Sequence, residues 1–211
     1  MARWSAIESE ARAQHGPLLA GVDEVGRGPL AGPVVACAIV MPPGERAIAG
    51  VDDSKRLSPA LRVALATRIR ERALAVCLGA ASVPEIDRVN IYHATVRAMQ
   101  RALTRIPAAL GEAPHHVLVD GLPLRTLGHT HTAVVKGDSK CYAIACASIV
   151  AKVTRDRLME QLHARYPAYA WARNAGYGTA QHREALAVHG LTRHHRRSFC
   201  LDEQVTLDLL S

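Results

Sequence analysis

The stretch Ala20-Gly21-Val22-Asp23-Glu24-Val25-Gly26-Arg27-Gly28-Pro29-Leu30-Ala31-Gly32-Pro33 joins two apolar runs of the sequence. The first run, residues 18–22, ends in two adjacent carboxylates, and the second, residues 34–41, is rich in β-branched side chains. The pattern predicts a strand, a tight glycine turn and a second strand, as in a β-hairpin. Because side chains alternate along a strand, Asp23 and Glu24 should point to opposite faces unless the strand ends or twists there.

The Gly-Arg-Gly turn after these carboxylates has the chemistry of a ligand-binding loop. Gly26 and Gly28 carry no side chain, so a ligand can approach their backbone amides closely. The guanidinium group of Arg27 offers a fork of donors that suits a phosphate. An ordinary solvated loop is the alternative interpretation of the same residues.

Composition indicates one domain with an anionic partner. The chain has 211 residues, 49% of them hydrophobic, which suffices for a single core. We expect one domain over residues 1–211, with a core at about 18–165 and a helical, basic, substrate-binding portion at about 166–211. The formal charge of +7 favours a nucleic acid as partner.

The sequence carries no sign of an exported or membrane protein. Its five cysteines include no Cys-x-x-Cys pair, which argues against a zinc site or a disulfide framework. The N-terminus lacks the apolar core of a signal peptide, and no apolar run reaches transmembrane length. We therefore expect a cytoplasmic protein without a membrane partner. Because no surplus apolar helix indicates an interface, we also expect a monomer.

Helices and further strands follow the hairpin in alternation. Residues 1–16 are expected to form a short helix or an arm. Ser58 and Pro59 are typical of a helix start. Helices are predicted at about 58–74, 84–103, 140–165 and 179–189, and strands at about 76–83, 115–120 and 130–136. The sequence thus predicts an α/β fold, a mixed sheet of about five strands flanked by helices, with a helical C-terminal portion.

Acidic residues end three of the predicted strands. They are Asp23 with Glu24, then Asp120, then Asp138. Four converging carboxylates repel one another unless cations neutralise them. Oxygen ligands of this kind suit Mg²⁺ or Mn²⁺, and two such ions can hold the attacking and leaving oxygens of a phosphodiester displacement. The alternative is that these acids only cap turns.

The C-terminal portion is strongly basic. Residues 161–201 contain six arginines and a single acid, Glu184. Such a tract is suited to the phosphate backbone of a nucleic acid. A solvated basic surface without a ligand is the alternative.

These motifs, taken together and in order, resemble bacterial ribonuclease HII from about Leu19 to Phe199. The resemblance rests on the quoted stretch from Gly21 to Val34 and on six further motifs. These are Asp53-Ser54-Lys55; Glu85-Ile86-Asp87 with Asn90-Ile91; Val119-Asp120-Gly121; Lys136-Gly137-Asp138-Ser139 leading into residues 147–156; Gly176-Tyr177-Gly178-Thr179 with His182; and His195-Arg196-Arg197-Ser198-Phe199.

The resemblance implies a ribonuclease H-like fold and an endoribonuclease. The enzyme would hydrolyse the RNA strand of RNA–DNA hybrids and cut 5′ of single ribonucleotides embedded in duplex DNA. It would use two Mn²⁺ or Mg²⁺ ions and leave 3′-hydroxyl and 5′-phosphate ends. Carried over to this sequence, Asp23, Glu24, Asp120 and Asp138 would be the metal-binding catalytic carboxylates.

The resemblance also implies substrate contacts by Gly26, Arg27, Gly28, Lys55, Tyr177 and Arg196. The glycine turn would read the 2′-hydroxyl, which both donates and accepts hydrogen bonds. Tyr177 would sense the sugar across the junction, and Lys55 would contact a phosphate, its alternative being an ordinary solvated lysine. Ala175 departs from the family, which usually has lysine there, and this puts substrate affinity in doubt.

Two rival functions remain open. A structure-specific DNA nuclease on the same fold would not need a sugar-reading turn, and a non-catalytic hybrid-binding module would lack at least one of the four carboxylates. The C-terminal segment Thr206-Leu207-Asp208-Leu209-Leu210 is similar to a sliding-clamp-binding peptide. A tail that folds back on the core is the alternative for that segment.

Overall fold

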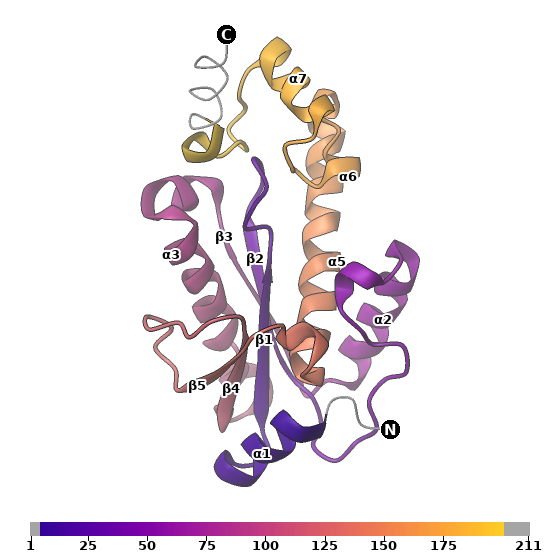
Figure 1. Cartoon of the computed structure of the whole chain (residues 1–211), viewed down its shortest axis with the longest axis vertical. Coiled ribbons are helices and arrows are strands. Elements are labelled where there is room, and N and C mark those ends of the chain that lie inside the picture. Colours follow the sequence, from indigo (N-terminus) through magenta and orange to yellow (C-terminus); the bar gives the residue numbers. More distant parts are fainter. Residues whose placement is uncertain (1–4, 201–211) are drawn as a thin grey trace.

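The computed structural model describes residues 5–200, which form a mixed sheet with helices on both faces (Figure 1). The strands are β1 (Leu19–Val25), β2 (Val34–Val40), β3 (Ala75–Ala81), β4 (His116–Asp120) and β5 (His131–Val134). The helices are α1 (Ser5–His15), α2 (Pro59–Arg72), α3 (Val83–Leu103), α4 (Ile106–Leu110), α5 (Tyr142–Arg165), α6 (Trp171–Asn174) and α7 (Ala180–His189).

The five strands lie in the order β3-β2-β1-β4-β5. β1 pairs antiparallel with β2, and β2 with β3, whereas β4 runs parallel to both β1 and β5. The predicted hairpin and the predicted number of strands are confirmed. β1 at the centre of the sheet therefore joins an antiparallel half to a parallel half.

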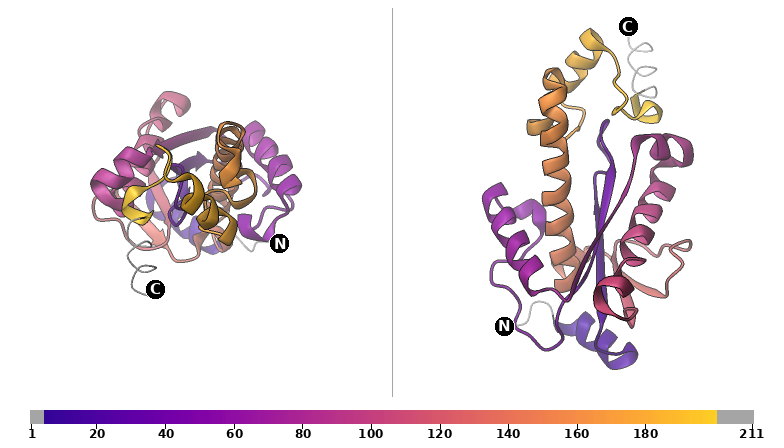
Figure 2. Two further views of the ribbon diagram at one scale, coloured as in Figure 1. Left: turned by 90° about the horizontal axis from the view of Figure 1, so that it is seen from above. Right: turned by 180° about the vertical axis from the view of Figure 1, so that it is seen from behind.

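The alternation of side chains along β2 explains the two helical layers. Ala36, Ala38 and Val40 face the core that includes α3, whereas Cys37 and Ile39 face the core that includes α2 and α5. Both sets are buried because the sheet is covered on both faces, as the views from the front and from behind show (Figures 1 and 2). The continuous apolar run of β2 is what such a two-sided strand requires.

Small residues allow α5 to lie directly on β1. A Cβ atom added at Gly21 would lie 2.3 Å from the carbonyl carbon of Ala143. Gly79 in β3 is in a similar position, since its Cβ would lie 2.0 Å from the carbonyl oxygen of Ala98 in α3.

Two elements differ from the prediction. The fifth strand ends at Val134, and the chain then passes through Lys136 with a φ of +57° into the short 3₁₀ helix η2 (Gly137–Ser139). Asp138 therefore lies in this turn and not at a strand end. In α3, Asn90 has a φ of +66°, and its side-chain oxygen accepts a hydrogen bond from the N–H of His93, which starts the second half of the helix.

The chain after α5 covers one end of the sheet. α6, α7 and the segment to residue 200 lie beyond the tips of β1 and β2, and seen from above they cross this end (Figure 2). Trp171 and Tyr169 pack there against Met159 of α5 and Ala31 of the β1–β2 loop. The C-terminal portion is therefore anchored to α5 and to the β1–β2 loop by an apolar cluster separate from the core of the sheet.

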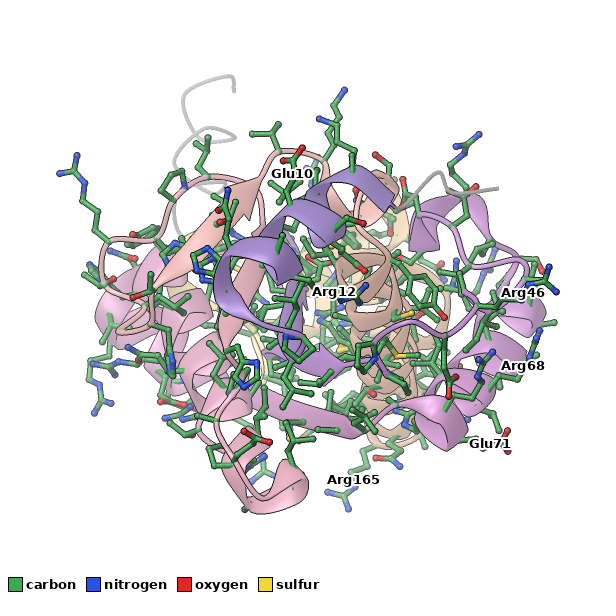
Figure 3. All side chains as sticks on the ribbon, turned by 90° about the horizontal axis from the view of Figure 1, so that it is seen from below. Glu10, Arg12, Arg46, Arg68, Glu71 and Arg165 are labelled. Carbon is green, nitrogen blue, oxygen red and sulfur yellow. The ribbon has the colours of Figure 1, made fainter. Side chains whose placement is uncertain are left out.

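The opposite end carries α1. Around it, Arg46, Arg68 and Glu71 extend from α2 and its preceding loop away from the core (Figure 3). All five cysteines lie within the described residues, where they are buried and form no disulfide. No helix between residues 5 and 200 is long and apolar enough to cross a membrane.

Candidate active site

The pairing of β1 with β4 brings two of the predicted carboxylates together. Val22 lies opposite Val119 in this parallel pair, so Asp23 and Asp120 follow at the same level on neighbouring strands. The turn after β5 joins them, because the N–H of Gly137 donates to Asp120 Oδ1 at 2.6 Å. Asp138 follows this glycine and is buried, as is Asp23.

The pKa of Asp23 indicates that its carboxylate interacts with the charges of Glu24 and Asp120. Burial raises this pKa well above its usual range, and the negative charges of Glu24 and Asp120 raise it further. A hydrogen bond from Ser148 of α5 opposes the shift. Positive charge placed nearby would favour the ionised form of such a buried carboxylate.

Glu24 and Asp138 show a pKa shift in the same direction, which basic side chains oppose. Burial raises the pKa of Glu24, and Arg27, whose Nη1 lies 3.3 Å from Glu24 Oε1, opposes the rise. Burial and the charges of Asp53 and Asp120 raise the pKa of Asp138, opposed by Lys55, whose Nζ lies 3.5 Å from Asp138 Oδ2. Both basic side chains are more than half exposed, so these ion pairs hold their partners weakly.

The Asp53-Ser54-Lys55 motif is attached to this site by its serine. Ser54 Oγ lies 2.9 Å from Ser148 Oγ, and Asp53 Oδ1 accepts from the N–H of Lys55 at 2.9 Å. The turn therefore holds the lysine at the rim of the carboxylate cluster, where its side chain is 79% exposed.

The donor set suits a hard divalent cation. All four groups are carboxylates, and their mutual repulsion is what a bound cation relieves. Beside them lies an open cavity of about 380 Å³ lined by Glu24, Asp120, Arg27 and Tyr92. Between residues 5 and 200, no three His, Cys, Asp or Glu side chains are already arranged around a single metal position. The residues therefore fit such a cation in chemistry and charge, although their side chains are spread apart.

The glycine turn lies next to Tyr177. Arg27 and Gly28 are exposed, whereas Gly26, with a φ of +90°, is buried. A Cβ atom at Gly28 would lie 3.7 Å from Cε1 of Tyr177, whose side chain is 49% exposed. The carbonyl oxygen of Gly176 accepts from the N–H of Leu30 at 2.9 Å and so fixes one turn against the other. Two motifs far apart in the sequence thus form one exposed surface.

Arg196 departs from its predicted role. Its side chain has no exposed surface, and its guanidinium donates to the carbonyl oxygens of Gly26, Arg27 and Gly32. The expectation that Arg196 contacts the substrate is wrong, because a fully buried side chain cannot reach a phosphate. The other five arginines of the tract are exposed: Arg165, Arg173, Arg183, Arg193 and Arg197.

Sequence reasoning missed a second buried arginine and a pair of histidines. Arg155 of α5 is also fully buried and donates to carbonyl oxygens of the β1–β2 loop. His182 and His195 are buried with their Nε2 atoms 3.0 Å apart, and His182 Nδ1 lies 2.9 Å from the carbonyl oxygen of Tyr177. A basic residue in an arginine-rich stretch gives no sign in sequence that it points inward.

Comparison with known proteins identifies relatives over most of the chain. The family profile described as Ribonuclease HII matches residues 20–202, a range that contains all four carboxylates. Ribonuclease HII of Thiobacillus denitrificans is 55% identical over 185 residues, which cover 87% of this chain and 88% of that protein.

Solved structures agree with this similarity. Ribonuclease H2 from Pyrococcus horikoshii OT3 superimposes with a TM-score of 0.70 at 28% identity, over 86% of this chain and 93% of that chain. The RNase HII of Archaeoglobus fulgidus, solved in complex with PCNA, gives a TM-score of 0.70 at 25% identity, over 85% and 94% of the two chains. The expected ribonuclease H-like fold is confirmed.

Proposed function

The chain belongs to the ribonuclease HII family, an enzyme family of the ribonuclease H type, and from this premise we propose how its site works. The enzyme cuts the RNA strand of RNA–DNA hybrids, and it cuts duplex DNA on the 5′ side of a single embedded ribonucleotide. The observation that carries this proposal is the position of the Gly26–Gly28 turn, exposed at Arg27 and Gly28, between the carboxylate cluster and Tyr177. The residues proposed to cut the phosphodiester and those proposed to recognise the ribose therefore lie next to one another.

Asp23, Glu24, Asp120 and Asp138 are proposed as the residues that hold two Mg²⁺ or Mn²⁺ ions. When bound, such ions activate water and stabilise the charge that develops on a phosphate. Burial first, and repulsion by neighbouring carboxylates second, raises the pKa values of Asp23, Glu24 and Asp138, and a bound cation would offset both effects. Hydrolysis at this site is proposed to leave 3′-hydroxyl and 5′-phosphate ends.

The remaining residues position the nucleic acid. The exposed ammonium of Lys55 and guanidinium of Arg27 lie beside the carboxylates and are proposed to contact phosphates next to the cut. The N–H groups of the glycine turn donate to the 2′-hydroxyl, and the ring of Tyr177 packs against the neighbouring deoxyribose. The exposed arginines of the C-terminal portion bind the phosphate backbone further away.

Cleavage of three matched duplexes tests this proposal. One strand is RNA, DNA with a single ribonucleotide, or DNA alone, and its complement is DNA. The proposal predicts metal-dependent cutting of the first two and none of the third. Cutting of the all-DNA duplex would support a structure-specific DNA nuclease, and tight binding without any cutting would support a hybrid-binding module.

We further propose a sliding clamp as partner and the cytoplasm as compartment. The clamp-like segment Thr206–Leu210 lies outside the described residues, and the proposal rests on its sequence and on the PCNA complex of the archaeal relative. Truncation after Gln204 should weaken clamp binding while hybrid cleavage is kept, and unchanged affinity would contradict it. The cytoplasm suits five cysteines without a disulfide among residues 5–200.

A further inference from the structure

The guanidinium group of Arg196, in the C-terminal portion, binds the β1–β2 loop from its buried side. Arg196 Nη2 donates to the carbonyl oxygen of Gly26 at 2.5 Å, and Nη1 donates to that of Arg27 at 2.7 Å. Nη2 and Nε also donate to the carbonyl oxygen of Gly32, at 2.8 and 3.0 Å. One buried side chain thus spans both sides of the turn.

Because the peptide group is planar, the direction of these carbonyl groups fixes the direction of the N–H groups in the same peptides. No peptide bond between residues 5 and 200 is cis, and in a trans peptide the C=O and N–H bonds point to opposite sides. The carbonyl of Gly26 shares its peptide with the N–H of Arg27, and the carbonyl of Arg27 shares its peptide with the N–H of Gly28. Because Arg196 draws both carbonyls inward, both N–H groups point outward.

These two N–H groups are available to a ligand. Arg27 and Gly28 are exposed, and within the described part of the chain neither N–H has a hydrogen-bond acceptor. They lie between Glu24, which pairs with Arg27, and the ring of Tyr177. A pair of donors fixed at this place suits the oxygen of a sugar hydroxyl.

We propose that Arg196 is a positioning residue for ribonucleotide recognition, because it fixes the outward direction of the Arg27 and Gly28 N–H groups. This inference rests on the proposed function of the glycine turn. A turn rich in glycine is intrinsically flexible, and donors that must first be ordered contribute less to recognition than donors already in place. A planar guanidinium can hold two carbonyls at once, whereas an ammonium group is a single point of charge.

Burial of Arg196 is costly, which indicates that its contacts matter. Burial lowers the pKa of its guanidinium to about 9, and the neighbouring charge of Arg155 acts in the same direction. The ring of Phe199 lies 5.1 Å from Arg196 Cζ and gives partial compensation. The negative charge of Asp87 and the carbonyl oxygens of the loop also stabilise the guanidinium.

Arg155 provides a matched control. It is equally buried and also donates to loop carbonyls, those of Pro33 at 2.9 Å and Ala31 at 3.0 Å, and to that of Ala175 at 2.8 Å. None of these carbonyls shares a peptide with the N–H of Arg27 or Gly28. The Arg155 side chain also packs against Gly26, but it donates to neither carbonyl that orients the N–H groups of Arg27 and Gly28. Loss of its hydrogen bonds should therefore cost stability and leave the direction of those two N–H groups unchanged.

The experiment compares Arg196→Lys and Arg155→Lys in the full-length enzyme. Affinity is measured in EDTA for a DNA duplex with one ribonucleotide and for the same duplex in all-deoxy form, and kcat and KM are measured with Mg²⁺. Arg196→Lys should lower kcat at the ribonucleotide about 10²-fold and reduce the ribo-over-deoxy preference, with all-deoxy affinity unchanged. Arg155→Lys should keep the wild-type preference. A wild-type preference in Arg196→Lys would overturn the inference.

If Arg196→Lys does not fold, hydrogen exchange of backbone amides in the wild-type protein provides a second test. Amide exchange of Arg27 and Gly28 should be fast in the free protein and slow when the ribonucleotide duplex, but not the all-deoxy duplex, is bound. Protection in the free protein, or equal protection by both duplexes, would overturn the inference. A wild-type enzyme that neither prefers nor cuts the ribonucleotide duplex would instead contradict the proposed function.

Discussion

Asp23 occupies the most demanding position in the site, since it is buried and two other carboxylates lie within its electrostatic reach. At the scale of single residues, its carboxylate has two opposite effects. It is proposed to hold the cation that cutting requires, and without a cation its charge destabilises the fold. These effects can be separated by replacing it with a neutral isostere.

Asp23→Asn and Asp120→Asn should each lower cleavage about 10³-fold or more while hybrid binding is largely kept. Asp23→Asn should also raise the melting temperature in EDTA at pH 7. The reason is that the pKa of Asp23 is raised in the folded state, so its ionisation above that pKa favours unfolding. The control is Glu112→Gln, which removes an exposed carboxylate shortly before β4 and should change neither property. Retained turnover in either aspartate variant would contradict the carboxylate site.

Tyr177 gives a prediction about specificity. Its ring is exposed beside Gly28, where it can pack against the sugar next to the ribonucleotide. Tyr177→Ala should weaken cutting at a single ribonucleotide more than cutting of an all-RNA strand in a hybrid. Tyr177→Phe keeps the ring and should stay near the wild-type ratio. Equal losses on both substrates would remove the proposed sensing role.

At the scale of elements, the approach of α5 to β1 depends on a missing side chain. A methyl group at Gly21 would meet backbone atoms of Ala143, which cannot move independently of the helix. Gly21→Ala should therefore lower the free energy of unfolding by about 3 kcal/mol or more, measured by urea denaturation. Gly111→Ala is the control, since nothing lies within 4 Å of its Cβ position and it carries only the strain of a φ of +89°, about 1 kcal/mol. Equal losses in the two variants would show that α5 can shift.

The segment around α7 should be sensitive to acid through His195. Burial lowers the pKa of this imidazole to about 4 from its usual 6.5, and the neighbouring His182 and His194 act in the same direction. Its Nδ1 accepts from the N–H of Thr192, so its Nε2 donates to His182. Below pH 6.5 the unfolded chain binds a proton that the folded chain excludes, so stability falls as the pH drops from 6.5 towards 4.

Urea unfolding at pH 7.5 and 5.0 measures this effect. His195 alone should account for about 2 kcal/mol of the loss between these values, and the loss should be smaller by that amount in His195→Gln. The comparison between variants matters because the raised pKa values of Asp23, Glu24 and Asp138 give a change of the opposite sign. An identical pH dependence in wild type and His195→Gln would contradict this account of the histidine pair.

Local patterns were enough to predict most elements. The β1–β2 hairpin, the helix that begins after Ser58 and the alanine-rich helix α5 follow from periodicity, capping and turn residues. The turn that carries Asp138 was not predicted, because it depends on a left-handed Lys136 that no sequence rule favours. The inward direction of Arg196 was also not predicted, because only the folded loop supplies the carbonyls that bind it.

At the scale of the whole molecule, the parallel and antiparallel halves of the sheet meet at β1. In the parallel half, Asp23 and Asp120 lie at the same level on neighbouring strands. In the antiparallel half, the loop between β1 and β2 is hydrogen-bonded to the C-terminal portion through Arg196 and the carbonyl oxygen of Gly176. We propose that the chain folds as one unit, because the C-terminal portion packs on α5 and on the β1–β2 loop through Met159 and Ala31. Composition predicted the anionic partner, and only the tertiary structure shows where the exposed arginines of the C-terminal portion lie relative to the proposed cutting site.

The central claim is that the sugar reader and the carboxylate site act together on one phosphodiester. The most direct test is cleavage of an end-labelled DNA duplex with a single ribonucleotide, in Mg²⁺, in Mn²⁺ and in EDTA. The account predicts one metal-dependent cut immediately 5′ of the ribonucleotide and none in EDTA. Absence of that cut in both metals, from an enzyme that degrades a long RNA–DNA hybrid, would contradict the claim.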